Sequence, residues 1–441
     1  MDKRFIHFCR SLFVVVAIAL LAPSAAAAAT DPLLADQWAL SPDAIGAGEA
    51  WTQSDGAGVL VAILDSGLQL DHPDLAANVW RNPGEVAGNG IDDDRSGVID
   101  DIHGASMFDG SANVADDNGH GTHVAGIVAA LQGNGIGGSG LAPGAKILPV
   151  KVLDSNMSGT TETLAMGIRY AVDRGAKILN VSVNTDTASD DVKSAVRYAG
   201  ERGAVVVASA GNNRRNIDLL PSFPASLSDP AVFSVAAAND GGLLWDGSNT
   251  GLLSIDIAAP GARIASTTFR SSYQSRTGTS AAAPFVAASL ALLSAARPDL
   301  PMSTLRAAIT DTTRRSSLLS SLLGGGRLDV GAAMHRVVGA GWRTAGPAGS
   351  ATAASLRLSA KSKVRAGKRM KLRWSAVGTE TVAKWRISLN GRVVASVPAT
   401  AAGVSRKVSR RGRNIWRVVG FDAAGAKVVA AKRAFKVLPR S

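Results

Sequence analysis

Four nearly continuous runs of apolar residues constrain the fold of this chain more than any other feature. They cover residues 58–64, 146–153, 176–183 and 204–209. Runs without a polar residue at every second position are typical of strands buried on both faces of a parallel sheet. Segments with the apolar spacing of helices lie between them and cover residues 120–131, 161–174 and 190–202. This alternation predicts an α/β fold whose parallel sheet is covered by helices, with functional groups at the carboxyl ends of the strands.

The charged residues are divided unevenly along the 441 residues of the chain. The tail, residues 341–441, contains 23 Lys and Arg against 2 Asp and Glu, whereas the rest contains 24 and 33. The tail therefore has a net charge of +21 and the rest a net charge of −9, a contrast that usually marks a domain boundary. We expect a first domain at residues 30–338, a linker rich in small residues at 339–354 and a second domain at 355–441.

The first 29 residues have the features of an export signal. Lys3, Arg4 and Arg10 precede an apolar run of about 11 residues, against roughly 20 for a membrane span, and small residues follow at 25–29. We expect residues 1–29 to be a signal peptide and the mature protein to be secreted, extracellular or periplasmic. A membrane anchor is the alternative interpretation, and we expect no later run to span a membrane. Removal of the signal also removes Cys9, the only cysteine of the chain, and with it any disulfide.

Three short segments carry the residue types of nucleophilic catalysis. Asp65 follows the first apolar run, His120 lies between two glycines at the start of a helical segment, and Ser280 lies just before the apolar run 285–296. Each has an ordinary alternative when it is taken alone: a carboxylate at a turn, a metal-binding pair with His123, and a serine that caps a helix. The metal-binding alternative is weak, because the two histidines lack the glutamate of the metalloprotease helix motif.

Taken together, these segments resemble the sequence blocks of the subtilisin-like serine proteases, the subtilases. The blocks are Leu64-Asp65-Ser66-Gly67, His120-Gly121-Thr122-His123-Val124-Ala125-Gly126 and Gly278-Thr279-Ser280-Ala281-Ala282-Ala283-Pro284. The resemblance extends over residues 31–333, and it departs from the family at Ala281, where methionine is usual. Residues 208–212 are similar to the oxyanion segment of the family, and residues 326–329 are similar to its closing segment. The resemblance implies a three-layer subtilisin-like fold with a parallel central sheet.

By this resemblance, Asp65, His120 and Ser280 would form a catalytic triad, and the side chain of Asn212 would contribute to an oxyanion hole. A serine hydroxyl is a weak nucleophile at neutral pH, and histidine has a suitable pKa for the base that takes its proton. The chain would then be a serine endopeptidase that cleaves protein or peptide substrates through an acyl-enzyme, with no cofactor for catalysis. The alternative is a catalytically silent protein that keeps the subtilase shell and binds peptides or adheres to surfaces.

An extended substrate peptide would pair with two backbone segments of such a protein. The resemblance implies substrate-binding roles for Ser158, Gly159, Ser182, Val183, Asn184, Ala210 and Gly211. The family often has glycine where Met157 and Asn184 stand, so these side chains would narrow the cleft. We expect no carboxylate in the pocket for the residue before the cut, which favours an apolar or broad preference.

An acidic segment between Asp65 and His120 resembles a calcium-binding loop. Its candidate ligands are Asp92, Asp94, Ser96 and Asp100, which stand at positions 1, 3, 5 and 9 of the loop pattern. His103 occupies position 12, where the pattern has glutamate, so a solvated acidic turn is an equal alternative. Ca²⁺ is thus a candidate structural ion. We also expect no inhibitory pro-domain before residue 30, so that folding would depend on bound ions or on another molecule.

Alternating polar and apolar residues in the tail predict strands. Asn390-Gly391 is a strong hairpin signal. The tail has about six or seven such strands, which predict a small all-β domain, a sandwich of the immunoglobulin or fibronectin type. One interpretation of its many Lys and Arg residues is attachment to an anionic polymer of the cell envelope or surface, to lipid head groups or to nucleic acid. The other is a soluble basic face without a partner. Nucleic acid is the weakest of these partners, because the tryptophans alternate like core residues.

Overall fold

Seven parallel strands form the central sheet of the computed structural model. Their order is β2-β3-β1-β4-β5-β6-β7. The strands are β1 (Leu60–Asp65), β2 (Ala105–Ser106), β3 (Lys146–Lys151), β4 (Ile178–Val181), β5 (Val205–Ser209), β6 (Val232–Ala238) and β7 (Ile257–Pro260). β1 pairs with β3 on one side and with β4 on the other. The predicted parallel sheet is confirmed.

The structure describes residues 30–316, 319 and 325–339 and much of the tail. The described parts of the tail are 355–359, 363–366, 368–377, 384–389, 392–398, 400, 402–407, 412–421 and 427–438. The predicted signal peptide and residues 340–354 of the predicted linker lie outside the described residues.

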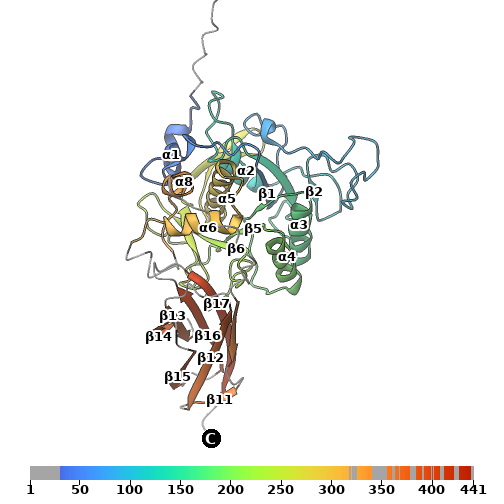
Figure 1. Ribbon diagram of the computed structural model, residues 1–441. Helices are drawn as coiled ribbons and strands as arrows, with labels where there is room; N and C mark the ends of the chain where they lie inside the picture. The colour runs from blue at the N-terminus through green and yellow to red at the C-terminus, as the bar shows by residue number, and fades with distance from the viewer. Residues whose placement is uncertain are drawn as a thin grey trace, which may run out of the picture.

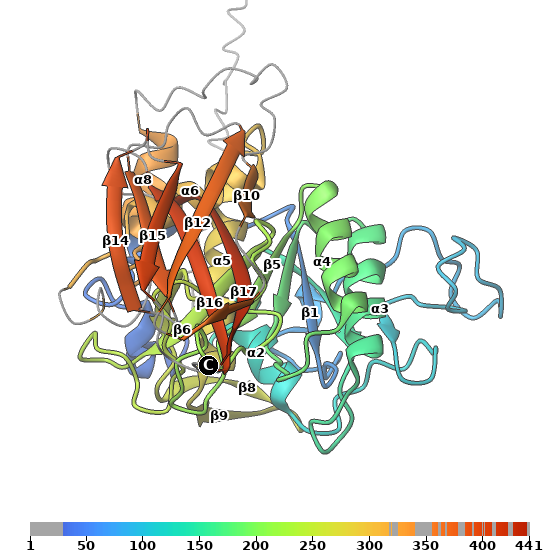
Figure 2. The same cartoon turned by 90° about the horizontal axis from the view of Figure 1, so that it is seen from below.

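Helices cover both faces of the sheet and complete three layers (Figures 1 and 2). One face carries α3 (Thr161–Asp173) and α4 (Asp190–Glu201), and the other carries α2 (His120–Ala129) and α5 (Thr279–Ala296). Alternate residues of β1 supply the two interfaces. Val61 and Ile63 belong to the core that contains α2 and α5, whereas Ala62 and Leu64 belong to the core that contains α3 and α4. Burial on both faces explains the continuous apolar run at this strand.

Shorter elements close the domain around α2 and α5. They are α1 (Ala47–Trp51), α6 (Met302–Asp311), α8 (Val330–Val338), the antiparallel hairpin of β8 (Ile264–Thr268) and β9 (Ser272–Arg276), and the 3-10 turns η1 (Leu34–Asp36), η2 (Trp38–Leu40) and η3 (Ala76–Asn78). The hairpin packs on α2, and α6 and α8 pack on α5. Both central helices are thereby covered on the side away from the sheet.

The helix α5 is apolar on nearly all sides. By length and composition, α5 is the one helix among those that the structure describes that could cross a membrane. However, 78% of its apolar window is buried inside the protein, against the sheet and the helices α6 and α8. A helix that is apolar all round is also typical of the core of a large soluble domain.

The described part of the tail forms two sheets, in the orders β10-β12-β15 and β11-β17-β16-β13-β14. Their strands are β10 (Ser355–Ser359), β11 (Lys363–Arg365), β12 (Arg369–Val377), β13 (Lys384–Leu389), β14 (Arg392–Pro398), β15 (Gly403–Lys407), β16 (Gly412–Phe421) and β17 (Lys427–Leu438). Side chains of both sheets share one core, in which the rings of Trp374 and Trp385 lie 5.9 Å apart. The predicted all-β domain is confirmed as a two-sheet sandwich, and its immunoglobulin or fibronectin type stays a prediction.

The sandwich contacts the α/β domain through its five-stranded sheet. Val418 of β16 lies in the sandwich core, whereas its neighbour Val419 packs against Leu253 of the α/β domain. Successive residues of a strand face opposite sides of the sheet. The outer face of the five-stranded sheet therefore meets the α/β domain, and the outer face of the three-stranded sheet lies on the far side of the sandwich.

Candidate active site

The candidate site lies at the carboxyl edge of the central sheet, as predicted. Asp65 is the last residue of β1, residues 182–184 follow β4, and residues 210–212 follow β5. These three strands are neighbours in the sheet, so the segments that follow them meet at one edge.

Asp65 and His120 form a short hydrogen bond. The distance from His120 Nδ1 to Asp65 Oδ1 is 2.7 Å, and the same oxygen accepts the backbone N–H of Ser66 at 2.8 Å. The Asp65 side chain is fully buried, whereas that of His120 is 13% exposed. Because the carboxylate accepts the proton on Nδ1, the second ring nitrogen of His120 keeps its lone pair for a base reaction.

Glycines on both sides of His120 allow the close packing of this helix start. Gly119 has a φ of +87°, and an added Cβ there would lie 2.5 Å from Cδ1 of Phe269. An added Cβ at Gly121 would clash with the carbonyl oxygen of Gly67, next to the end of β1. Glycine at these two positions lets α2 start directly against the loop after β1, which brings the imidazole to Asp65.

Asp116 is a half-buried organising residue that the sequence analysis missed. One carboxylate oxygen accepts hydrogen bonds from the Ser66 hydroxyl and from the N–H groups of Asn118 and Gly119. The other accepts the hydroxyl and the N–H of Thr122. Burial alone would raise the pKa of Asp116, but these hydrogen bonds outweigh it and hold the pKa below its usual value. Asp116 thus ties the loop after β1 to the start of α2.

Ser280 lies in the first turn of α5, beside an anchored amide. The N–H and the hydroxyl of Thr279 both donate to Oδ1 of Asn212 at 2.9 Å. This assigns the amide orientation, so the NH₂ group of Asn212 points away from Thr279. An ideal Cβ on Gly278 would lie 3.1 Å from Nδ2 of Asn212 and 3.3 Å from Oγ of Ser280. The amide donor and the serine hydroxyl therefore border the same small space.

Ser182 contacts Ser280 through its side chain. The Ser182 hydroxyl donates to the backbone carbonyl of Ser280 at 3.0 Å and accepts a hydrogen bond from the buried amide of Asn180 at 2.8 Å. This chain of hydrogen bonds links β4 to the first turn of α5. The sequence analysis assigned Ser182 to substrate binding, and the structure adds this contact with the residue that carries the candidate nucleophile.

The other predicted substrate-binding residues lie in the loops around this edge. Nδ2 of Asn184 lies 3.5 Å from the position of a Cβ on Gly211. Asn249, which the sequence analysis missed, holds the loop after β5: its side chain donates to the carbonyl of Ala210 and accepts the N–H of Asn213. Val183 is partly buried against the core of α3 and α4.

In the segment before α3, the backbone of Ser158 is not free to pair with a substrate strand. The N–H of Ser158 donates to the side chain of Asp154, and its carbonyl accepts the N–H of Asp154, so this backbone unit is occupied by a turn. Gly159 packs against the carbonyl of Val152 too closely for a Cβ. Met157 has a φ of +61°, the left-handed region that favours glycine, which agrees with glycine being usual there in the family.

His123 is a buried structural residue and not a metal ligand. Its Nε2 lies 3.0 Å from the carbonyl of Ile264 and 3.1 Å from that of Gln274, so the nitrogen carries hydrogen and donates to the β8–β9 hairpin. Burial, followed by the charges of Arg276 and His120, lowers the pKa of His123 to about 3. The alternative of a metal-binding histidine pair is therefore wrong.

The low pKa of His123 predicts a pH-dependent stability. Between pH 6.5 and about 3 the unfolded chain binds a proton at this residue and the folded chain does not, so stability falls as the pH falls. The loss is at most about 1.4 kcal/mol per pH unit. We expect the free energy of unfolding, measured by urea at pH 7 and pH 5, to depend less on pH in His123→Gln than in the parent. Equal dependence in the two proteins would contradict this account of His123.

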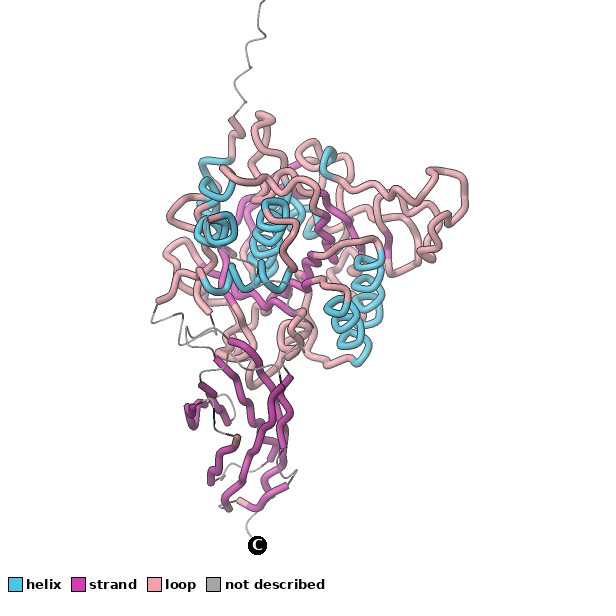
Figure 3. Tube along the Cα trace, viewed as in Figure 1, coloured by secondary structure: helices cyan, strands magenta, loops and turns pink. Residues whose placement is uncertain are grey.

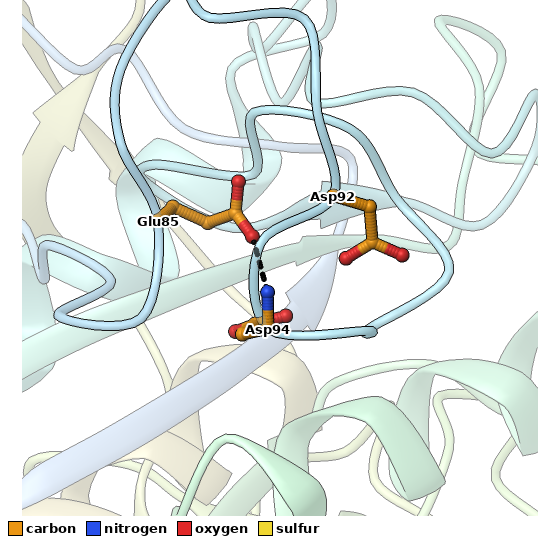
Figure 4. Close-up of side chains that lie close together, drawn as sticks. All are labelled: Glu85, Asp92 and Asp94. Atoms are coloured by element: carbon orange, nitrogen blue, oxygen red, sulfur yellow. Dashed lines mark hydrogen bonds between the residues drawn. The ribbon is translucent and has the colours of Figure 1, made fainter.

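The acidic insertion forms a cluster that differs from the predicted one. Carboxylate oxygens of Glu85, Asp92 and Asp94 lie within 4.8 Å of one another (Figure 4). Asp100 instead accepts the N–H groups of Gly88 and Gly90, outside this cluster. Two of the four predicted ligands are therefore in the cluster. The carboxylate of Asp100 caps a turn, and Glu85, which the sequence analysis did not name, joins the cluster.

Ser96 contacts this cluster through its backbone N–H. Its N–H donates to carboxylate oxygens of both Asp92 and Asp94, whereas its hydroxyl contacts the backbone of Val98. The hydroxyl of Ser96 is thus directed to the turn, and its role as a ligand stays a prediction.

The insertion cluster has an excess of negative charge. Arg174 pairs with Asp94, so three carboxylates face one guanidinium. Glu85 is 6% exposed, its Oε1 accepts the N–H of Asp94, and its Oε2 has no hydrogen-bond partner among the described residues. A buried carboxylate oxygen without a partner is costly, and oxygen ligands in this number suit a hard cation such as Ca²⁺.

Comparison with known proteins decides the family. The model of the subtilase family matches residues 56–341. The chain belongs to the subtilase family. The predicted class, a serine peptidase of the subtilisin type, is therefore confirmed.

Several named proteins are similar to this subtilase. Thermitase of Thermoactinomyces vulgaris is 37% identical over 288 residues, which cover 65% of this chain and 92% of thermitase. The thermophilic serine proteinase of Bacillus sp. strain AK1 is 37% identical over 245 residues, and the match covers 55% of this chain and 54% of that protein. A protease of Pseudoalteromonas arctica PAMC 21717 has a solved structure with a TM-score of 0.59, 29% identity, and coverage of 70% of this chain and 99% of its own. The subtilase thus spans nearly all of thermitase and about half of the Bacillus proteinase.

Proposed function

We propose that this subtilase is a secreted endopeptidase that uses Asp65, His120 and Ser280 as its catalytic triad. The observation that carries the proposal is the 2.7 Å hydrogen bond between Asp65 and His120. Its location supports the proposal, because Asn212 and Ser280 border one space and lie in the segments that follow β5 and begin α5. A buried carboxylate on Nδ1 fixes the tautomer of the base and stabilises the imidazolium that forms when the base takes a proton.

In the proposed reaction, Oγ of Ser280 attacks the substrate carbonyl and transfers its proton to Nε2 of His120. The carbonyl oxygen becomes an oxyanion, which accepts hydrogen bonds from Nδ2 of Asn212 and from the backbone N–H of Ser280. The C–N bond then breaks, His120 gives its proton to the amine that leaves, and an acyl-enzyme on Ser280 remains. Water, activated by the same histidine, hydrolyses the ester. Apart from the substrate and water, only residues of the chain take part in these steps.

Labelling with a fluorophosphonate probe tests the proposal directly. The probe reacts with activated serines, so we expect one stoichiometric label on the wild-type protein and none on Ser280→Ala. Folded wild-type protein that stays unlabelled would instead support the alternative of a catalytically silent subtilase shell.

Asn212→Ala should lower kcat by about 10² to 10³ with little change in KM. This size is the one measured for the corresponding donor of subtilisin, a member of the same family. The reason here is that the variant removes one donor to the oxyanion and leaves the triad in place. Steady-state kinetics on a chromogenic peptide would measure it, and a variant in which KM rises while kcat is unchanged would contradict the role of Asn212.

The proposal also covers export, the roles of the domains and the binding of substrates. Residues 1–29 would direct export, 30–338 would form the peptidase domain, 339–354 the linker and 355–441 a basic domain that attaches the enzyme to an anionic polymer. Protein or peptide substrates would bind along Ser158, Gly159, Ser182, Val183, Asn184, Ala210 and Gly211. Asn184, beside Gly211, would narrow the pocket for the residue before the cut.

We also propose that the insertion holds a structural Ca²⁺ on Glu85, Asp92 and Asp94. The buried, unpartnered oxygen of Glu85 and the excess of two negative charges support this site. An ion that binds only the folded chain stabilises it by about 2.7 kcal/mol at 100 times its Kd.

Glu85→Gln should therefore reduce the gain in Tm that calcium produces, relative to the wild type. Asp100→Asn is the matched control, because Asp100 lies in the same insertion and caps the 88–90 turn outside the cluster. Differential scanning calorimetry with calcium or EDTA would measure both. A calcium response that is lost in Asp100→Asn and kept in Glu85→Gln would refute the site.

A further inference from the structure

The outer face of the three-stranded sheet of the tail carries a row of cations. In β12 the residues Met370, Leu372 and Trp374 are buried in the sandwich core, with exposures of 2%, 0% and 6%. Arg369, Lys371 and Arg373 alternate with them and are exposed. We call these three residues the cationic row. Residues two apart on a strand lie about 7 Å apart, so the row is a straight line of regularly spaced positive charges.

No acidic side chain of the described strands offsets this row. The strands β10 to β17 contain no Asp or Glu, and the two acidic residues of the tail, Glu380 and Asp422, lie outside the described residues. None of the ion pairs among the described residues includes a member of the row. Charges of one sign at this spacing repel each other, and a ligand with regularly spaced negative charges would relieve the repulsion.

Hydroxyl groups accompany the row. In the register of the sheet, Ser405 of β15 is opposite Lys371, and Ser359 of β10 is opposite Arg373. Both serines are exposed. Directly opposed residues of antiparallel strands have side chains on the same face. Two positions of the row thus combine a cation with a neutral hydrogen-bond donor. A phosphodiester suits this pair, because it offers two charged oxygens at once and arginine binds such oxygens with two N–H groups.

The described side chains of the sandwich lack the groups that other anionic partners need. Trp374 and Trp385 are buried, so neither of these rings is offered for stacking on nucleobases. The exposed large apolar residues all lie before residue 244, so the described side chains of the sandwich include none for insertion into a lipid layer. The row also lies on the far side of the sandwich from the contact between Val419 and Leu253.

We propose that the cationic row of Arg369, Lys371 and Arg373 binds a linear phosphodiester polymer. This inference deepens the proposed attachment role of the tail by naming its surface and the chemistry of its ligand. The polymer would lie along β12, with successive phosphates beside successive cations. The peptidase domain, on the opposite side of the sandwich, would stay free to meet protein substrates.

Binding to poly(glycerol phosphate), a linear phosphodiester polymer, tests the inference on the full chain in the Ser280→Ala background, which prevents self-digestion. One variant changes the row to Arg369→Gln, Lys371→Gln and Arg373→Gln. The matched control changes three exposed cations of the other sheet, Lys363→Gln, Arg365→Gln and Lys384→Gln. We expect the row variant to lose at least 30-fold in affinity at 0.1 M salt and the control less than 3-fold. The slope of log K against log salt should fall in magnitude by about 2 in the row variant alone.

Equal losses in the two variants, or no loss in either, would overturn the inference, because binding would then not depend on the row. Hyaluronate and phosphatidylglycerol vesicles separate the other sources of negative charge. Row-dependent binding to either of them that is as tight as binding to poly(glycerol phosphate) would overturn the assignment of a phosphodiester polymer. Peptide hydrolysis is measured separately on the row variant with Ser280 intact. Hydrolysis without row-dependent binding refutes this inference alone, and row-dependent binding without hydrolysis refutes the proposed peptidase function alone.

Discussion

Ser280→Ala should lower kcat on a peptide substrate by a factor on the order of 10⁶, the size of loss known for the corresponding serine of subtilisin. Without Oγ no acyl-enzyme can form, and His120 has no serine proton to take. The oxyanion donors and the substrate cleft remain, so residual hydrolysis well above the uncatalysed rate is expected. KM should change little, because Oγ contributes little to the binding of the ground state.

Two measurements make this test specific. The melting temperature of Ser280→Ala should equal that of the wild type within a few degrees, since Ser280 holds its turn through its backbone carbonyl and the Ser182 hydroxyl. Mass spectrometry should detect an acyl-enzyme on the wild type alone under rapid quench. Turnover that survives in Ser280→Ala at more than about a tenth of the wild-type rate would remove Ser280 from the mechanism.

Asp65→Asn should lower kcat by about 10⁴ while the fold is kept. The amide of asparagine can donate a hydrogen to Nδ1 of His120, which favours the tautomer that carries its proton on Nε2. That nitrogen then lacks the lone pair that takes the proton of Ser280. The variant also loses the negative charge that stabilises the imidazolium. Kinetics from pH 6 to pH 9 would measure the loss of kcat. Thermal unfolding would show whether the fold is kept.

Asp116→Asn is the matched control for Asp65→Asn. It changes a second, half-buried carboxylate near His120 whose hydrogen bonds organise the helix start and do not reach the imidazole. An amide there must turn its NH₂ toward N–H donors, which costs about 1 to 3 kcal/mol. We expect Asp116→Asn to lower Tm more and kcat less than Asp65→Asn. The reverse order would contradict the roles assigned to the two carboxylates.

The sequence predicted the elements that depend on contiguous residues. Asp65 could be placed at the end of a strand because the run before it is apolar on both faces, and the blocks around His120 and Ser280 carry their own glycines and helix signals. Asp116 was missed because its role depends on Ser66, 50 residues earlier, which no local pattern connects to it. Its one signal was its position three residues before Gly119, where an acceptor for unpaired N–H groups is useful.

The calcium prediction assumed a continuous loop, whereas the carboxylates that the structure brings together come from separate segments. The loop pattern counts ligands along one segment, but the chain folds back so that Glu85 reaches Asp94, and Asp100 turns to the amides of Gly88 and Gly90. The same limit applies to α5. Its composition alone allows a membrane span, and only the sheet and helices around it explain why such an apolar helix lies inside.

The hydrogen bonds from Thr279 to Asn212 have a mechanical consequence. The residue that steadies the amide is the immediate neighbour of Ser280, so displacement of the first turn of α5 carries both the attacking oxygen and the donor that awaits the developing charge. Motion of the cleft walls can then change how tightly a peptide binds without changing the distance between these two atoms. In an enzyme built this way, distortion of the cleft walls should change KM more than kcat.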